Sequence, residues 1–147
     1  MDKIKDLLEE NKLTLSTLVV FTRAENEIHK REYETIKQSG LTICQFGVLE
    51  ALYNKGDLKI CEIIEKILTT SGNITVVIKN LEKDGLIKRN IDPNDKRSCV
   101  ISITDKGKEI IEEILPNHIK NIKNIFDVLT DEEKITLKNI LKKFKNI

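Results

Sequence analysis

The sequence lacks the residue patterns that mark several large classes of protein. It holds only two histidines and three cysteines, and Cys44, Cys61 and Cys99 form no C-x-x-C pair. Two histidines are too few for a zinc-sensing site, which needs several converging ligands. No glycine-rich phosphate loop is present either, because the stretch 71–73 (SGN) lacks the lysine and the further glycine of a P-loop. These absences argue against an enzyme, a metal site and a bound cofactor.

Long apolar runs are missing as well. Residues 1–6 (MDKIKD) lack the apolar region of a secretory signal, and no purely apolar run approaches the ~20 residues that a membrane-spanning helix needs. Three cysteines cannot all pair within one chain, so reduced thiols in a cytoplasm fit best. The chain has 25 basic and 24 acidic residues, a net charge of +1. The overall charge therefore does not indicate a nucleic-acid partner.

What is present predicts one mostly helical domain over residues 1–147. A chain of 147 residues is long enough for a single domain with a real core. Residues 12–38 contain neither proline nor glycine, and their interrupted apolar stripe indicates one long helix. A second helix is predicted over residues 43–53, where Thr42 can cap its start.

The C-terminal part is also helical in pattern. Asp105 follows a capping threonine and opens a long helix, which Pro116 is expected to kink or briefly interrupt because proline removes a backbone hydrogen bond. Thr130 and Glu133 form a capping box at the start of a last helix. The residues of this last helix that we expect to be buried are Ile135, Leu137, Ile140, Leu141 and Phe144.

Two short helices with a tight joint are predicted in the middle of the chain. Residues 58–68 are apolar at 60, 63, 64 and 67, which is helical spacing. A Thr-Thr-Ser stretch at 69–71 can cap a following helix, and Gly85 can end it in the left-handed conformation. The apolar stripe of that second helix is Ile74, Val77, Ile78 and Leu81. Such a pair is typical of a helix-turn-helix.

A two-stranded hairpin with a basic tip is predicted directly after this helix. Residues 86–91 and 99–103 alternate as strands do, and the turn Asp92-Pro93-Asn94-Asp95 has a turn-forming residue at every position. Lys96 and Arg97 follow the turn. A helix-turn-helix with a hairpin of this kind is a winged helix-turn-helix, a shape used mostly to hold duplex DNA.

The polar face of the second short helix suits a DNA groove. Small polar and amide side chains near a helix start can reach base edges, and lysines farther along can meet phosphates. For an amphipathic helix taken alone, a merely solvated face is the alternative. The candidate DNA-contacting residues here are Thr70, Ser71, Asn73, Thr75, Val76, Lys79, Asn80 and Lys83.

In this combination the sequence resembles the MarR family of bacterial winged helix-turn-helix transcription regulators. The stretches that carry the resemblance are LTICQFGVLEAL (41–52), SGNITVVIKNLEKDGLIKR (71–89) and DPNDKRSCVISITDKGKEII (92–111). The flanking helices fit the same plan, so the resemblance covers essentially the whole chain. It implies an obligate homodimer that binds a pseudo-palindromic operator and usually represses transcription.

The hairpin tip resembles the Asp-x-Arg element of that family. The resemblance implies that Arg97, with Lys96 beside it, enters the adjacent minor groove while Asp95 holds the guanidinium of Arg97 in place. A planar, weakly hydrated guanidinium suits a narrow and negatively charged groove. A solvated charged turn is the alternative.

The resemblance also divides the chain into a DNA-binding part (41–104) and a helical dimerisation part (1–40 and 105–147). Both helical segments carry apolar stripes, and neither is expected to contribute to the small winged module. Their stripes either pack on each other within one chain or interleave with those of a second copy. A single helix-turn-helix reads few bases, which favours the dimer.

A small aromatic or redox effector is a further implication of the resemblance, because the junction of the first, second and fifth helices of the family commonly forms a ligand pocket. Its candidate lining residues are Phe21, His29, Cys44 and Phe46. Cys44 lies in a first helical turn, where the helix dipole favours the reactive thiolate, although a small buried filler is the alternative. His29 and His118 are expected far apart, at the surface or an interface.

Two functions of different classes remain. The first is a ligand- or redox-modulated repressor that binds double-stranded DNA as a homodimer. The second is a winged-helix module that binds protein and no DNA, which the near-zero net charge favours.

Overall fold

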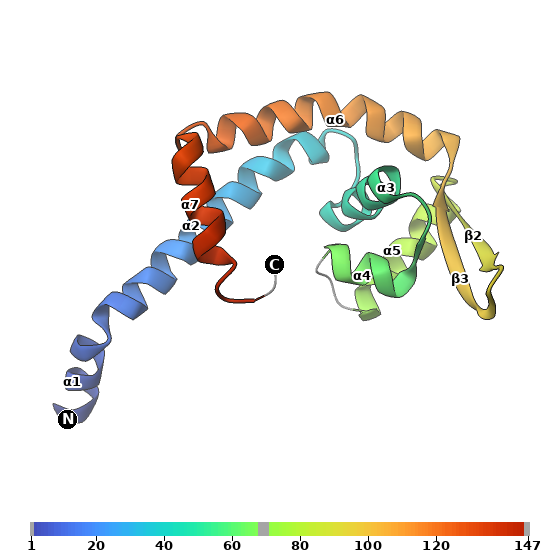
Figure 1. Ribbon diagram of the computed structural model, residues 1–147. Coiled ribbons are helices and arrows are strands. Elements are labelled where there is room, and N and C mark those ends of the chain that lie inside the picture. The colour runs from blue at the N-terminus through green and yellow to red at the C-terminus, as the bar shows by residue number, and fades with distance from the viewer. Residues whose placement is uncertain (1, 68–70, 146–147) are drawn as a thin grey trace.

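The protein is described by a computed structural model that covers residues 2–67 and 71–145, with the side chains of 71 and 72 left aside. Two helical arms, α1 with α2 and α6 with α7, extend from a small module that contains the other elements (Figure 1). The elements in chain order are α1 (Asp2–Glu10), α2 (Lys12–Lys37), α3 (Ile43–Lys55), β1 (Leu58–Lys59), α4 (Ile60–Ile67), α5 (Ser71–Lys83), β2 (Ile87–Asp92), β3 (Asp95–Ile103), α6 (Asp105–Phe126) and α7 (Asp131–Leu141).

Helix starts lie where the capping residues predict them. The hydroxyl of Thr42 accepts the Gln45 backbone N–H at 3.1 Å, and the Gln45 side chain accepts the Thr42 N–H at 3.0 Å, a capping box that opens α3. The predicted box at α7 is confirmed, since Thr130 and Glu133 make the same reciprocal pair. These hydrogen bonds hold the pKa of the Glu133 carboxyl below its usual value.

The end of α5 determines where the hairpin begins. Gly85 has φ +74°, a conformation that only glycine adopts without strain, and the N–H of Leu86 reaches back to the Leu81 carbonyl at 3.0 Å. The Thr104 hydroxyl donates to the Gly85 carbonyl at 2.7 Å and accepts the N–H of Gly107 at 3.1 Å. One side chain therefore joins the end of α5 to the start of α6.

The wing, the β2–β3 hairpin over residues 87–103, belongs to a three-stranded antiparallel sheet of order β1-β3-β2. The third strand corrects the sequence reading, which placed residues 58–68 in one helix. Leu58 and Lys59 are extended and pair with Ile101 and Val100, so α4 begins only at Ile60. The winged helix-turn-helix itself is confirmed.

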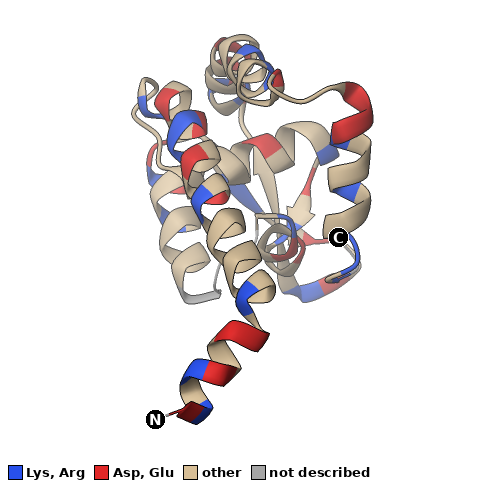
Figure 2. Ribbon diagram, turned by 90° about the vertical axis from the view of Figure 1, so that its left-hand side faces the viewer, with Lys and Arg blue, Asp and Glu red and all other residues tan. Residues whose placement is uncertain are grey.

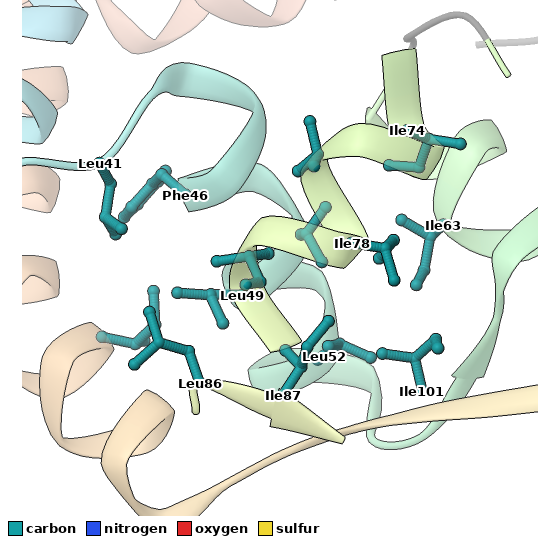
Figure 3. Close-up of a cluster of buried hydrophobic side chains, with 14 of the residues drawn as sticks. Leu41, Phe46, Leu49, Leu52, Ile63, Ile74, Ile78, Leu86, Ile87 and Ile101 are labelled. Carbon is teal, nitrogen blue, oxygen red and sulfur yellow. The ribbon is translucent and has the colours of Figure 1, made fainter. Parts of the chain in front are cut away.

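The core lies where α3, α4 and α5 pack against one another and against the sheet (Figure 3). It is built from aliphatic side chains of every element of the module, among them Leu49, Leu52, Ile63, Ile78 and Ile101. Each such side chain contributes about 1.5–3 kcal/mol when it is fully removed from water.

The expectation that the arms contribute nothing to the module is wrong. Ile36 near the end of α2 and Ile111 and Ile114 of α6 are buried members of the same core. α2 and α6 pack side by side, and α6 also contacts α3, so the inner ends of both arms belong to the module. Only their outer parts project away from it.

Pro116 does not interrupt α6, which continues through it from Asp105 to Phe126. The burial expected for the last helix differs from the structure. Ile135, Leu137 and Ile140 of α7 are exposed in the single chain, and Leu141 is half-buried. Phe144, which lies after the end of α7, is 81% exposed. None of the helices within 2–67 and 71–145 is long and apolar enough to cross a membrane.

Gly107 offers a direct test of how α6 packs on the module. A Cβ at this position lies 2.3 Å from the backbone oxygen of Leu86 and 2.8 Å from the Ile103 side chain. Because the first neighbour is backbone, Gly107→Ala is expected to destabilise the fold by about 1–3 kcal/mol, as overpacking does. The measurement is denaturant unfolding, with the exposed Lys108→Ala as the matched control. Equal midpoints for the two variants contradict the packing.

Candidate nucleic-acid interface

α5 presents one apolar and one polar face, as its sequence predicts. Ile74, Val77, Ile78 and Leu81 are buried in the core, which fixes the rotation of the helix. The opposite face is exposed along its described length, through Asn73, Thr75, Val76, Lys79, Asn80 and Lys83. Thr70 lies outside the described residues, and so does the side chain of Ser71.

Two residues of this face have features that the apolar stripe alone does not reveal. The Asn73 amide donates to Cys44 Sγ of α3 at 3.6 Å, so the start of α5 contacts the start of α3. Val76 is 57% exposed among polar neighbours. Apolar side chains in that setting match the methyl group of thymine in a major groove.

The wing tip presents two exposed cations. Lys96 and Arg97 lie at the start of β3, just after the turn. Asp95 Oδ1 accepts the backbone N–H of Arg97 at 3.0 Å, whereas the family resemblance implied a contact with the guanidinium. Asp95 therefore shapes the backbone that carries Arg97.

Asp92 is a residue that sequence reasoning treated only as a turn former. It is 5% exposed, although its neighbour Ile91 is 70% exposed, and a register irregularity lies between the two. The Asn94 N–H and the Lys59 ammonium hold the pKa of the Asp92 carboxyl below its usual value. The carboxylate contributes stability at neutral pH that is lost as the pH falls through this lowered pKa. No local pattern distinguishes such a residue from a solvated turn aspartate.

Charges of both signs are mixed over the molecule, as the composition predicts. Lys and Arg alternate with Asp and Glu along the helical arms (Figure 2). Within the module, Arg89 of β2 pairs with Glu82 of α5 at 3.0 Å, an exposed contact of small energetic value. The cations that lie on the exposed α5 face and the wing tip are Lys79, Lys83, Lys96 and Arg97.

The four candidate pocket residues are dispersed in the single chain. Phe21 and His29 are exposed on α2. They are separated by about 12 Å along the helix axis, at 1.5 Å per residue. Phe46 is buried, with its ring 4.7 Å from that of His118. Cys44 lines a hollow of about 410 Å³ between α3 and α4, together with Glu50 and Lys66.

His29 is exposed, as expected, but the expectations that His118 lies at the surface and that the two histidines are far apart are wrong. His118 is 2% exposed, and both histidines approach the same carboxylate: His29 Nδ1 lies 2.8 Å and His118 Nε2 3.9 Å from Glu32. Thr35 is hydrogen-bonded to His118 Nδ1 at 2.9 Å. Burial raises the pKa of the nearby Glu50 carboxyl, and His118 opposes that rise. This polar cluster joins α2, α3 and α6.

No metal site emerges at this cluster or elsewhere in the part of the chain that the structure describes, where no three His, Cys, Asp or Glu side chains are grouped to hold an ion. The arrangement that suits binding to duplex DNA is the exposed α5 face beside a basic hairpin. Figure 1 shows α4, α5 and the wing tip on the side of the module away from α6.

Comparisons with known proteins agree with this geometry. A model of the MarR family matches residues 41–99. YkoM of Bacillus subtilis, an uncharacterised helix-turn-helix-type transcriptional regulator, is 37% identical over 135 residues, which cover 92% of this chain and 88% of that protein.

Solved structures resemble the whole fold. Sco3205, a MarR family transcriptional regulator from Streptomyces coelicolor crystallised in complex with DNA, has a TM-score of 0.81 at 23% identity, and the match covers 92% of this chain and 86% of that one. BpsR of Bordetella bronchiseptica, whose DNA binding is regulated by 6-hydroxynicotinic acid, has a TM-score of 0.77 at 26% identity, with 85% and 89% covered. The similarity thus extends over most of the chain, arms included.

Proposed function

The chain belongs to the MarR family, and on that premise we propose that it is a repressor that binds an inverted-repeat operator as a homodimer. Members of this family are DNA-binding regulators of transcription and are not enzymes. The observation that supports this proposal most is the pairing of an exposed polar α5 face with a basic wing tip on one small module. Because its partner is chromosomal DNA, we place its action in the cytoplasm.

α5 is the element that enters the major groove. Its buried stripe fixes which side chains point outward, and Asn73, Thr75 and Asn80 carry the donors and acceptors that read base edges. Lys79 and Lys83 lie farther along the helix, where ammonium groups meet the phosphate backbone. The wing places Arg97 toward the flanking minor groove, where a narrow groove attracts a guanidinium.

The apolar surface of the arms supports the proposed dimer. The exposed large apolar residues of α1 and α2 are Ile4, Leu7, Leu8, Leu13, Leu15, Leu18, Val19, Val20 and Phe21. α7 adds Ile135, Leu137 and Ile140, and Phe144 lies three residues after its end. An exposed apolar surface of this extent is rare on monomers and is typical of an interface. A second copy covers it and places two α5 helices on one operator.

The test of DNA binding is selection of duplexes from random sequence by the full chain, followed by titration at several salt concentrations. An inverted repeat is expected, with log affinity falling linearly with log salt at a slope of about −0.9 per neutralised phosphate. A protein-binding module without DNA binding, which the net charge of +1 favours, selects no duplex and shows no such slope. A promoter that carries the repeat is expected to be silenced by the protein, and activation contradicts repression.

Small aromatic acids or oxidants are proposed to release the protein from DNA. The support is the polar cluster of α2, α3 and α6, to which His29 belongs and which Phe46 contacts through His118. The other two candidate contacts lie apart in the single chain, Cys44 in the hollow between α3 and α4 and Phe21 about 12 Å from His29 along α2. A ligand that prefers one spacing of the two α5 helices stabilises that state by about 2.7 kcal/mol at a hundred times its Kd and weakens DNA binding. Thermal unfolding measures the stabilisation by the ligand, and operator titration measures the loss of DNA affinity. Null results with phenolic acids, peroxides and copper leave an effector-independent regulator.

A further inference from the structure

Asp92 is an ionised side chain buried at the otherwise exposed tip of the hairpin. Pro93, Asn94 and Asp95 beside it are exposed, yet Asp92 itself is almost fully covered. A carboxylate taken out of water is costly unless hydrogen bonds and an opposite charge replace the water. Both of its oxygens have such partners.

The two oxygens face different parts of the molecule. Oδ1 accepts the backbone N–H of Asn94 at 2.9 Å, within the turn. Oδ2 lies 3.2 Å from the Lys59 ammonium and 3.4 Å from the Ser98 hydroxyl on the returning strand. Asp92 therefore joins both sides of the hairpin tip to a residue outside the hairpin.

Lys59 is in turn held by the helix-turn-helix. It lies in β1 directly before α4, and its backbone N–H donates to the Glu62 carboxylate at 2.8 Å. Its register partner is Val100 in β3. Because β1 has only two residues, the ladder supports the middle of β3, and the Lys59–Asp92 pair extends that support to the tip.

Asp92 lies on the face of β2 opposite Ile91, as regular alternation predicts, and there it is buried while Ile91 is exposed. A register irregularity lies between the two residues, directly before the turn. The segment that follows carries Asp95, which holds the Arg97 N–H. The turn is thus fixed from Asp92 on one side and from Asp95 on the other.

We propose that Asp92, paired with Lys59, is a positioning residue for DNA binding that holds the wing tip in the orientation from which Arg97 reaches the minor groove. This inference rests on the proposed function as a DNA-binding regulator. A tip that is already ordered in the free protein loses less conformational freedom on binding than a loose one. Asp92 itself touches no DNA in this account.

The test is Asp92→Asn in the full chain, titrated with operators that carry A/T-rich or G/C-rich outer positions. Charge alone predicts tighter binding, because a negative group near phosphate is removed. Positioning predicts the opposite: affinity falls about twofold to tenfold, the cost of ordering one long side chain, and the preference for A/T outer positions is lost. Asp84→Asn, an exposed carboxylate after α5, is the matched charge control and is expected to bind as tightly or more tightly.

A second variant, Lys59→Met, separates positioning from general loss of the fold. Lys59→Met leaves the turn contact to Asn94 in place and is expected to lose the same outer preference. Asp92→Asn or Lys59→Met combined with Arg97→Ala is expected to weaken operator binding no further than Arg97→Ala alone, because all three substitutions act on the contact that Arg97 makes. The inference is overturned if Asp92→Asn binds as tightly as the wild-type chain, or more tightly, and keeps its preference for A/T-rich outer positions. If Asp92→Asn does not fold, the inference is overturned when Lys59→Met keeps that preference in full. Wild-type chain that binds no duplex overturns the proposed function itself.

Discussion

A chain that lacks residues 130–147 is expected to be monomeric and to lose operator affinity by about 10²–10⁴-fold. In a dimer, the first bound half-site makes the second contact intramolecular, and that advantage disappears in a monomer. No described residue of α7 is buried in the single chain, so its removal leaves the core of the module intact. Sedimentation equilibrium and operator titration measure the two effects.

Removal of residues 1–40 is expected to have the same two effects, but it also takes away Ile36, which is buried in the core. A shorter deletion of residues 1–24 is therefore the cleaner partner, since it removes the exposed apolar residues of α1 and of the first part of α2 and spares Ile36. Helical content by circular dichroism serves as the folding control. A truncated monomer that binds the full operator with unchanged affinity contradicts the role of the arms.

Local signals were predictable from the sequence because each acts within a few residues. Thr42 and Thr130 cap the helices that they precede, through hydrogen bonds to residues three positions later. Gly85 ends α5 because its positive φ suits glycine alone. The stripe of α5 was equally readable, since helical spacing alone decides which residues share a face.

Contacts between distant segments were not predictable in this way. Leu58 and Lys59 directly precede the apolar stripe of α4, and only their pairing with β3 makes them a strand. Asp92 resembles any turn aspartate until Lys59 is placed beside it. His118 looked like a surface residue, whereas packing of α6 on α2 and α3 buries it.

The arms show a different limit of sequence reading. Their apolar stripes identify faces that need a cover, and the stripes at the inner ends of α2 and α6 are covered by the module itself. The stripe of α7 has the same composition, yet it is exposed in the single chain. Periodicity cannot distinguish a face that packs within the chain from one that packs on a second copy.

The two DNA-reading elements are expected to respond differently to substitution. Arg97→Ala should weaken operator binding by about 1.5–3 kcal/mol, the range for a hydrogen bond to a charged group, and relax the preference for A/T-rich outer positions. Asn73→Ala or Thr75→Ala should instead relax the preference at inner positions by about 1–3 kcal/mol for each lost base contact. Selection from random duplexes with each variant measures both preferences.

Asn73 requires its own control because its amide also contacts Cys44. Cys44→Ala removes that contact and keeps the amide, so it is expected to retain the inner preference if Asn73 acts on the base. Lys79→Ala and Lys83→Ala should lower affinity for all sequences alike and flatten the salt slope by about 0.9 per lost phosphate contact.

The division between inner and outer positions follows from the geometry of a symmetric dimer on an inverted repeat. In such a complex we expect the α5 helices to lie nearer the dyad and the wings to extend outward from it, so that Arg97 reaches positions that α5 does not. Arg97 is exposed, and its backbone is fixed by Asp95, so nothing described in the free chain opposes its entry into a groove. If Arg97→Ala leaves affinity and outer preference unchanged, the wing tip is only a solvated turn, and operator recognition rests on α5 alone.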